Sequence, residues 1–157
     1  MQDELQGSPV LLSFRINGAV ISLTGLSALL RALHSLLRET EFGLRGTSRS
    51  DWQLLAVQGG EAAGAPVALE LRLGSAAENA EVAAALLGLL EGLERGEFPE
   101  AGRWKAILSQ VLVLARSVEN GEVSTMSLGG PDGAAVRITA GTFEHAGRLL
   151  RDLPVQS

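Results

Sequence analysis

Short runs with strand-like patterning recur in pairs along this chain, and a segment with helical leucine spacing follows each pair. In the first pair, residues 10–16 and 19–23 flank Asn17-Gly18, the dipeptide that best suits a two-residue type I′ turn. The later pairs meet at glycine-rich joins, residues 52–58 with 67–73 and residues 122–128 with 134–139. Consecutive hairpins favour an antiparallel sheet with helices on one side. We predict an α+β domain whose antiparallel sheet is built from three β-hairpins, in the order ββα-ββα-α-ββα, with helices packed mainly on one face.

The residue patterns of these runs also predict where each strand lies in the sheet. The Asn17-Gly18 turn would pair Phe14 with Ile21 on a buried face. Residues 52–58 carry apolar side chains on both faces, which is typical of a central strand. Apolar and other residues alternate strictly over residues 67–73, which predicts a strand with one buried face and one solvent-exposed face. The outer face is expected to show arginines around Glu70, namely Arg15, Arg72 and Arg137.

Helix-start signals precede the leucine-rich segments. Thr24 is the expected cap of a helix over residues 25–42. Ser75 and Glu78 match the capping-box pattern, which predicts that a second helix begins there. A third helix is expected over residues 103–118, and a short one near the end of the sequence.

The 157 residues correspond to one domain. We expect a flexible leader at residues 1–8, a single α+β domain over residues 9–154 and a tail at residues 155–157. No secretory signal pattern and no apolar stretch of spanning length occurs, so a cytoplasmic protein with no membrane role is expected. Twelve arginines against one lysine suggest a bacterial gene.

Several chemistries lack the residues that they need. The chain has no cysteine, which excludes disulfides, thiol catalysis and Cys-ligated metals. The lone lysine, Lys105, is followed by Ala106, so no phosphate-binding loop of the Gly-Lys-Ser/Thr type exists. His34 and His145 fall on different predicted helices and would need carboxylates to hold a transition metal. No catalytic, cofactor-binding or metal-binding residue is predicted.

The third predicted helix has a wider apolar face than one buried side needs. Its apolar residues cover about 160° of the helical wheel, whereas a stripe a little over 100° wide suffices for a surface helix. Either the helix is wedged between the sheet and other helices, or part of it meets a second subunit. The second alternative predicts a homodimer with the interface residues Trp104, Ile107, Leu108, Val111, Leu112, Val113 and Leu114.

The acidic charge is concentrated in one segment. Residues 78–100 hold six glutamates and one arginine, a formal charge of −5 that equals the net charge of the whole chain. Such a run is usually a solvated face. The alternative is a docking surface for a basic partner, with the candidate residues Glu91, Glu94, Glu97 and Glu100.

A polar loop is expected at residues 43–50. Its arginines, Arg45 and Arg49, lie among hydroxyl side chains that can hold an anion together with guanidinium groups. The alternative is an ordinary solvated loop.

These observations favour a non-catalytic protein-interaction module, adaptor-, inhibitor- or chaperone-like, that works as a homo-oligomer with an unknown protein partner. The alternative is a small-molecule-binding domain or an enzyme without a recognisable motif. A nucleic-acid accessory protein is a weaker alternative, because the chain is acidic and the expected outer sheet face offers no aromatic side chain for base stacking.

Overall fold

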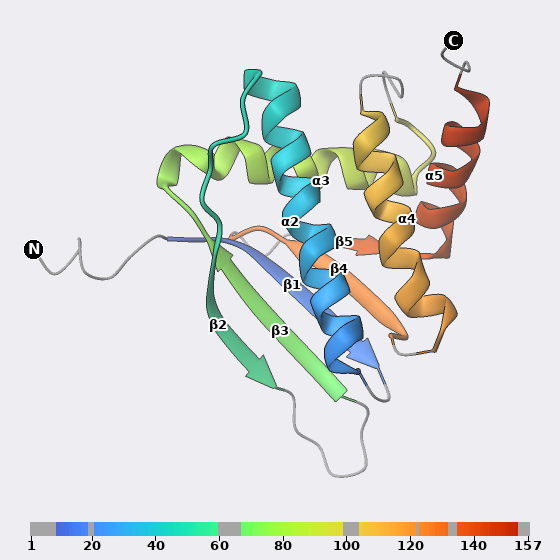
Figure 1. The fold of residues 1–157 in the computed structure, drawn as a ribbon, viewed down its shortest axis with the longest axis horizontal. Helices are drawn as coiled ribbons and strands as arrows, with labels where there is room; N and C mark the ends of the chain where they lie inside the picture. The colour runs from blue at the N-terminus through green and yellow to red at the C-terminus, as the bar shows by residue number, and fades with distance from the viewer. Residues whose placement is uncertain are drawn as a thin grey trace, which may run out of the picture.

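Five antiparallel strands form one sheet, and the helices cover one of its faces (Figure 1). The computed structural model describes residues 9–18, 21–59, 67–98, 104–121, 123–131 and 135–153. The elements in chain order are β1 (Val10–Gly18), α2 (Leu23–Arg45), β2 (Gln53–Gly59), β3 (Val67–Gly74), a 3-10 turn η1 (Ala77–Asn79), α3 (Ala80–Glu94), α4 (Lys105–Glu119), β4 (Thr125–Gly129), β5 (Ala135–Ile138) and α5 (Ala140–Asp152). The predicted α+β class is confirmed.

The sheet has the strand order β2-β3-β1-β4-β5, so β1 lies at its centre. Phe14 of β1 is opposite Leu71 of β3 on one side and Leu128 of β4 on the other. All three side chains are buried under the helices. Ser13 and Arg15, between the buried positions of β1, lie on the opposite face, which none of the described helices covers (Figure 1). The period-two pattern of β1 therefore sets which face of the sheet carries the core.

The first predicted hairpin does not form. Phe14 pairs with β3 and β4 rather than with Ile21, and Leu23 is the first residue of α2. Residues 19–20 of the predicted return strand lie outside the described residues. Asn17 supports strand pairing through two hydrogen bonds. Its side-chain amide donates to Thr125 Oγ1 at 2.9 Å, and its backbone carbonyl accepts from the backbone amide of Ser124 at 2.7 Å. The other two predicted hairpins, β2–β3 and β4–β5, are confirmed.

The position predicted for residues 52–58 is wrong: β2 is an edge strand. Apolar side chains on both faces indicate a central strand where helices cover both faces of a sheet, as in parallel sheets. Here only one face is covered, and β2 lies at the margin of that cover (Figure 1). Six of its seven residues are exposed and only Ala56 is half-buried.

Two helix starts differ from the predicted caps. The Ser22 hydroxyl, not Thr24, caps α2 by accepting from the Gly25 amide at 2.9 Å. The predicted capping box at Ser75 does not form, because the Ser75 hydroxyl is buried and donates to the Asp51 carbonyl at 2.9 Å. The Asn79 side chain donates to the same hydroxyl at 2.7 Å. Ser75 thus joins the end of β3 to the coil before β2, and a capping box opens α5 instead, at Thr139.

The core lies between the sheet and helices α2, α4 and α5, with α3 crossing at one end (Figure 1). Helices α2 and α4 approach closely at Gly43, where a Cβ atom would overlap the Trp104 ring. A glycine in α2 therefore makes room for the largest side chain at the start of α4. No helix in the described ranges is long and apolar enough to cross a membrane.

Candidate functional site

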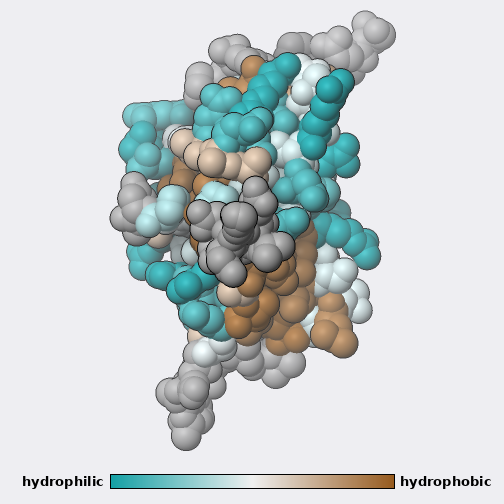
Figure 2. Space-filling view, turned by 90° about the vertical axis from the view of Figure 1, so that its left-hand side faces the viewer, coloured by the Kyte–Doolittle hydropathy of each residue, from teal (hydrophilic) through white to brown (hydrophobic). Residues whose placement is uncertain are grey.

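Exposed apolar side chains gather on β2. Leu54, Leu55 and Val57 are 48%, 36% and 53% exposed, respectively. Figure 2 views the molecule from the β2 side and shows an apolar patch on its lower part. Apolar side chains exposed singly are ordinary on a protein surface, but three on one strand are a candidate interaction surface. We call Leu54, Leu55 and Val57, with the backbone of β2, the β2 edge.

The backbone of the β2 edge presents one row of hydrogen-bonding groups outward, because only β3 pairs with it within the described sheet. Natural proteins protect such edges with charged side chains, proline or bulges. Residues 53–59 contain no charge and no proline. Their one protective device is a bulge at Leu55, where the register with β3 shifts by one residue.

The bulge places two exposed side chains on the same face. Leu54 pairs with Leu73 and Val57 pairs with Leu71, and both partners point into the core. Paired residues share a face, so Leu54 and Val57 extend the apolar face of the sheet beyond its helical cover. Without the extra residue, positions 54 and 57 would point to opposite faces.

The coil before β2 is anchored to α2 by a buried carboxylate. Glu41 is 3% exposed, and one oxygen accepts from the Ser50 amide at 3.0 Å while the other lies 3.3 Å from Arg45 Nη1. Burial alone would raise the pKa of this carboxyl. The hydrogen bonds from the Ser50 and Arg49 amides and from Arg45 outweigh burial and lower the pKa below its ordinary value. Glu41 is therefore a fixed anion at neutral pH that holds β2 in place.

Arg45, one of the two candidate residues of the predicted anion loop, is engaged within the chain. Arg45 lies in the last turn of α2, and its guanidinium donates to Glu81 Oε1 at 2.6 Å and to Asn79 Oδ1 at 2.7 Å as well as to Glu41. Two carboxylates thus neutralise the Arg45 cation and raise its pKa. Arg49 supplies a backbone contact to Glu41, while its side chain is exposed. Both arginines line one pocket of about 320 Å³, but Glu41, Asp51 and Glu78 line it as well, so the pocket is not a cationic one.

The proposed interface on α4 is mostly inaccessible. Of its seven residues, Leu112 and Val113 are half-buried and five are buried in the core of this chain: Trp104, Ile107, Leu108, Val111 and Leu114. The helix lies between α2 and α5 (Figure 1), which accounts for its wide apolar face. The wedged alternative is the arrangement found, and only Leu112 and Val113 of the seven predicted interface residues are partly accessible to a second subunit.

The acidic segment is partly neutralised from within. Arg95 lies 3.7 Å from Glu91 and 3.3 Å from Glu97. Glu94 is half-buried, and Glu100 lies outside the described residues. The predicted acidic docking surface is thereby reduced to exposed glutamates that share one arginine.

The open face of the sheet carries the expected arginines. Glu70 accepts from Arg15 at 3.5 Å and lies 3.6 Å from Arg72, so two cations share one carboxylate. Arg137 lies on β5, beyond Ser127, and is exposed. This face is polar, whereas the β2 edge is apolar.

The two histidines lie on different helices and have different surroundings. His34 is exposed on α2, and His145 of α5 has its Nδ1 atom 2.8 Å from the Leu93 carbonyl. No group of three metal-ligating side chains occurs within the part of the chain that the structure describes.

No protein-family model, curated protein or solved structure matches this chain.

Sequence reasoning missed the β2 edge. The relevant signal is the lack of charge in residues 53–59, which flank a hairpin loop in a chain with 20% charged residues. An uncharged apolar run is equally typical of a buried central strand and of an exposed edge strand. The sequence signal therefore distinguishes the two only once the strand order is known.

Proposed function

We propose that this protein is a non-catalytic interaction module that self-associates by pairing its β2 edge with the β2 edge of a second copy. The observation that carries this proposal is an edge strand with three exposed apolar side chains and no charged residue. Such an edge is a template for strand addition, in which backbone hydrogen bonds extend the sheet into the partner.

The pattern of β2 favours a second copy as the occupant. In a two-fold antiparallel pair the same surface is used twice, so the strand must be complementary to itself. A register that sets Leu54 against Val57 of the second copy also sets Gln53 against Gln58. Both pairings then match like with like, because Leu54 and Val57 share the apolar face, whereas Gln53 and Gln58 lie opposite Gly74 and Glu70.

Charge does not oppose this pairing. None of the acidic residues lies on β2, and Glu70 beside it is bound by Arg15 and Arg72. A strongly charged partner would find no complementary charge on this strand, whereas an identical neutral strand needs none.

The expected dimer is weak. Fully burying a leucine or valine contributes about 1.5–3 kcal/mol. Leu54 and Val57 are 48% and 53% exposed, so about half of that gain remains for each, and the four side chains of two copies contribute roughly 4 kcal/mol together. The entropy lost on association offsets much of this gain and of the gain from the edge hydrogen bonds, so the net affinity is low. We expect a dissociation constant of about 10–1,000 μM.

Sedimentation velocity over a concentration series tests the proposal. The wild-type protein should shift from monomer to dimer between about 5 μM and 1 mM. Val57→Lys places a charge on the edge and should keep the protein monomeric throughout. Leu44→Lys is the matched control, because Leu44 is 43% exposed at the end of α2, away from the edge, and this variant should dimerise like the wild type.

Circular dichroism and thermal unfolding of each variant establish that the fold is retained. A wild-type protein that remains monomeric at 1 mM contradicts the proposal. Equal dimerisation of the Val57→Lys variant and the wild type contradicts it as well, because the contact would then lie elsewhere.

A further inference from the structure

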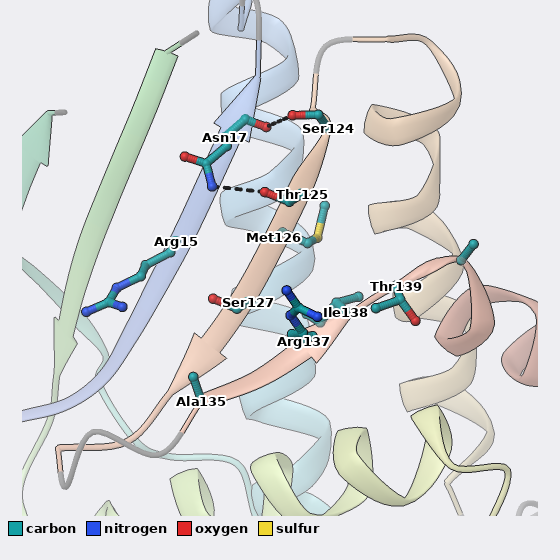
Figure 3. Close-up of a pocket in the computed structure, with 11 residues that line it drawn as sticks. Arg15, Asn17, Ser124, Thr125, Met126, Ser127, Ala135, Arg137, Ile138 and Thr139 are labelled. Atoms are coloured by element: carbon teal, nitrogen blue, oxygen red, sulfur yellow. Dashed lines mark hydrogen bonds between the residues drawn. The ribbon is translucent and has the colours of Figure 1, made fainter. Parts of the chain in front are cut away.

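A hollow of about 690 Å³ lies on the open side of the sheet, over β1, β4 and β5 (Figure 3). Ligand sites in proteins usually occupy about 300–1,000 Å³. The strand order places this hollow toward the opposite end of the sheet from the β2 edge. It is therefore a separate feature from the proposed dimer contact.

The charge of the hollow is opposite to that of the protein. Among the described residues, its lining contains Arg15 and Arg137 and no carboxylate, although the chain as a whole has a net charge of −5. The other polar groups of the lining are hydroxyls and an amide: Asn17, Ser124, Thr125, Ser127 and Thr139. Cations and neutral donors without an acidic residue favour an anion.

The sheet register places the two cations on either side of one hydroxyl. Arg15 of β1 pairs with Ser127 of β4, which pairs with Arg137 of β5. Two strand spacings separate the arginine Cα atoms by about 10 Å. Guanidinium groups on side chains of this length reach a common anion above Ser127.

Neither arginine is fully neutralised within the described part of the chain. Arg137 is exposed and forms no ion pair there. Arg15 extends toward β3 (Figure 3). Its contact with Glu70 of that strand is 3.5 Å long, the Arg15 side chain is 61% exposed, and Glu70 is shared with Arg72. An exposed ion pair of this kind contributes little to stability, so Arg15 can turn toward an anion at small cost.

We propose that this hollow binds the phosphate group of a small phosphorylated molecule, held over Ser127 by Arg137 and Arg15. A dianionic phosphate offers three terminal oxygens, enough for two guanidinium forks and a hydroxyl. A phosphate group fills only a small part of 690 Å³. The remaining space extends past Thr139 to Ala140, the first residue of α5, whose amino-terminal end also favours a negative group.

Isothermal titration at low ionic strength tests this site with inorganic phosphate, phenyl phosphate and acetate. We expect saturable binding of both phosphates, with phenyl phosphate tighter, and much weaker binding of acetate. Arg137→Gln should weaken phosphate binding about tenfold or more, since a hydrogen bond to a charged group contributes that much to an equilibrium constant. Arg15→Gln should weaken it by a smaller factor.

The matched control is Arg116→Gln, because Arg116 is exposed on α4, on the helical side of the sheet. This variant should bind phosphate like the wild type, and so should Val57→Lys, since dimerisation is not required. Equal affinity of the Arg137→Gln and Arg116→Gln variants overturns the proposed site. So does the absence of saturable phosphate binding.

A single-stranded oligonucleotide separates this site from a polyanion surface. If the oligonucleotide binds far more tightly than phenyl phosphate, with an affinity that falls steeply with salt, the hollow recognises a nucleic-acid backbone and the small-molecule proposal is wrong. Oligonucleotide binding no tighter than that of phenyl phosphate supports it.

Discussion

Glu41 shows how one carboxylate connects two elements of this fold. Its buried oxygens bind the amide of Ser50 ahead of β2 and the guanidinium of Arg45 on α2. Because these contacts favour the charged form, the pKa of Glu41 is lower in the folded protein than its ordinary value of 4.5. The carboxylate therefore stabilises the fold fully above its unfolded-state pKa, and this contribution is lost as the pH falls through the folded-state value.

We expect Glu41→Gln to lower the free energy of unfolding at pH 7 by about 1–3 kcal/mol, the usual cost of removing a partner from buried polar groups. Below about pH 4.5 the variant should lose less stability with falling pH than the wild type. Urea unfolding from pH 7 to pH 3 measures both effects. Glu119→Gln, on the exposed end of α4, should retain the wild-type profile. Parallel pH profiles for Glu41→Gln and the wild type would rule out this role.

At the scale of elements, the contact between α2 and α4 depends on a glycine. A methyl group at position 43 would overlap the Trp104 ring, which is buried at the start of α4. Gly88, on the exposed side of α3, has no atom within 4 Å of the place of its missing Cβ. The same substitution therefore has opposite expected effects at the two positions.

Gly43→Ala should destabilise the protein by about 1–3 kcal/mol, as overpacking of a core does. Gly88→Ala should stabilise it by about 0.4–1 kcal/mol, because alanine lowers the entropy of the unfolded chain and favours the helix. Thermal unfolding of both variants against the wild type measures the difference. A stabilising Gly43→Ala change would show that Trp104 moves aside freely and that this contact is not tight.

Elements with local partners were predictable from the sequence, and those with distant partners were not. The hairpins β2–β3 and β4–β5 join neighbours in the chain, and their turn residues and alternation are visible in the sequence. Strand β1 pairs instead with β3 and β4. The local hairpin that Asn17-Gly18 predicts does not form, because these non-local pairings occupy both edges of β1 and the Ser22 cap starts α2 shortly after the strand.

The candidate site was less predictable than the fold for a related reason. The sequence shows that α4 has a wide apolar face, but it does not show what covers that face. The covering residues come from α2 and α5, which are separate segments of the chain. The arginines of the open face were predicted, because strict alternation places them there. The hollow between Arg15 and Arg137 depends on strand order, which no local pattern encodes.

At the scale of the whole molecule, the proposed dimer continues the sheet across two copies. The absence of cysteine makes its register testable, since engineered thiols have no competitors. In the proposed pairing, Leu54 of one copy faces Val57 of the other, and no residue faces itself. A mixture of Leu54→Cys and Val57→Cys proteins should therefore form disulfide-linked heterodimers faster than either variant forms homodimers.

Non-reducing electrophoresis with a mild oxidant measures this rate, and a Leu44→Cys variant reports random collision. Equal rates for all combinations would reject the register. If either edge variant forms disulfide-linked homodimers preferentially, the strands pair in a different register, in which that residue lies on the two-fold axis.

The central place of β1 has a consequence for how this chain is made. Pairing of Arg15 with Glu70 spans 55 positions, and pairing of Asn17 with Thr125 spans 108. At bacterial or eukaryotic ribosomes that second interval takes on the order of ten seconds. Until then a strand containing Leu12, Phe14 and Ile16 lacks β4, one of its two neighbours in the sheet. The nascent chain is then open to aggregation, and a holding chaperone is the kind of factor that would raise its yield.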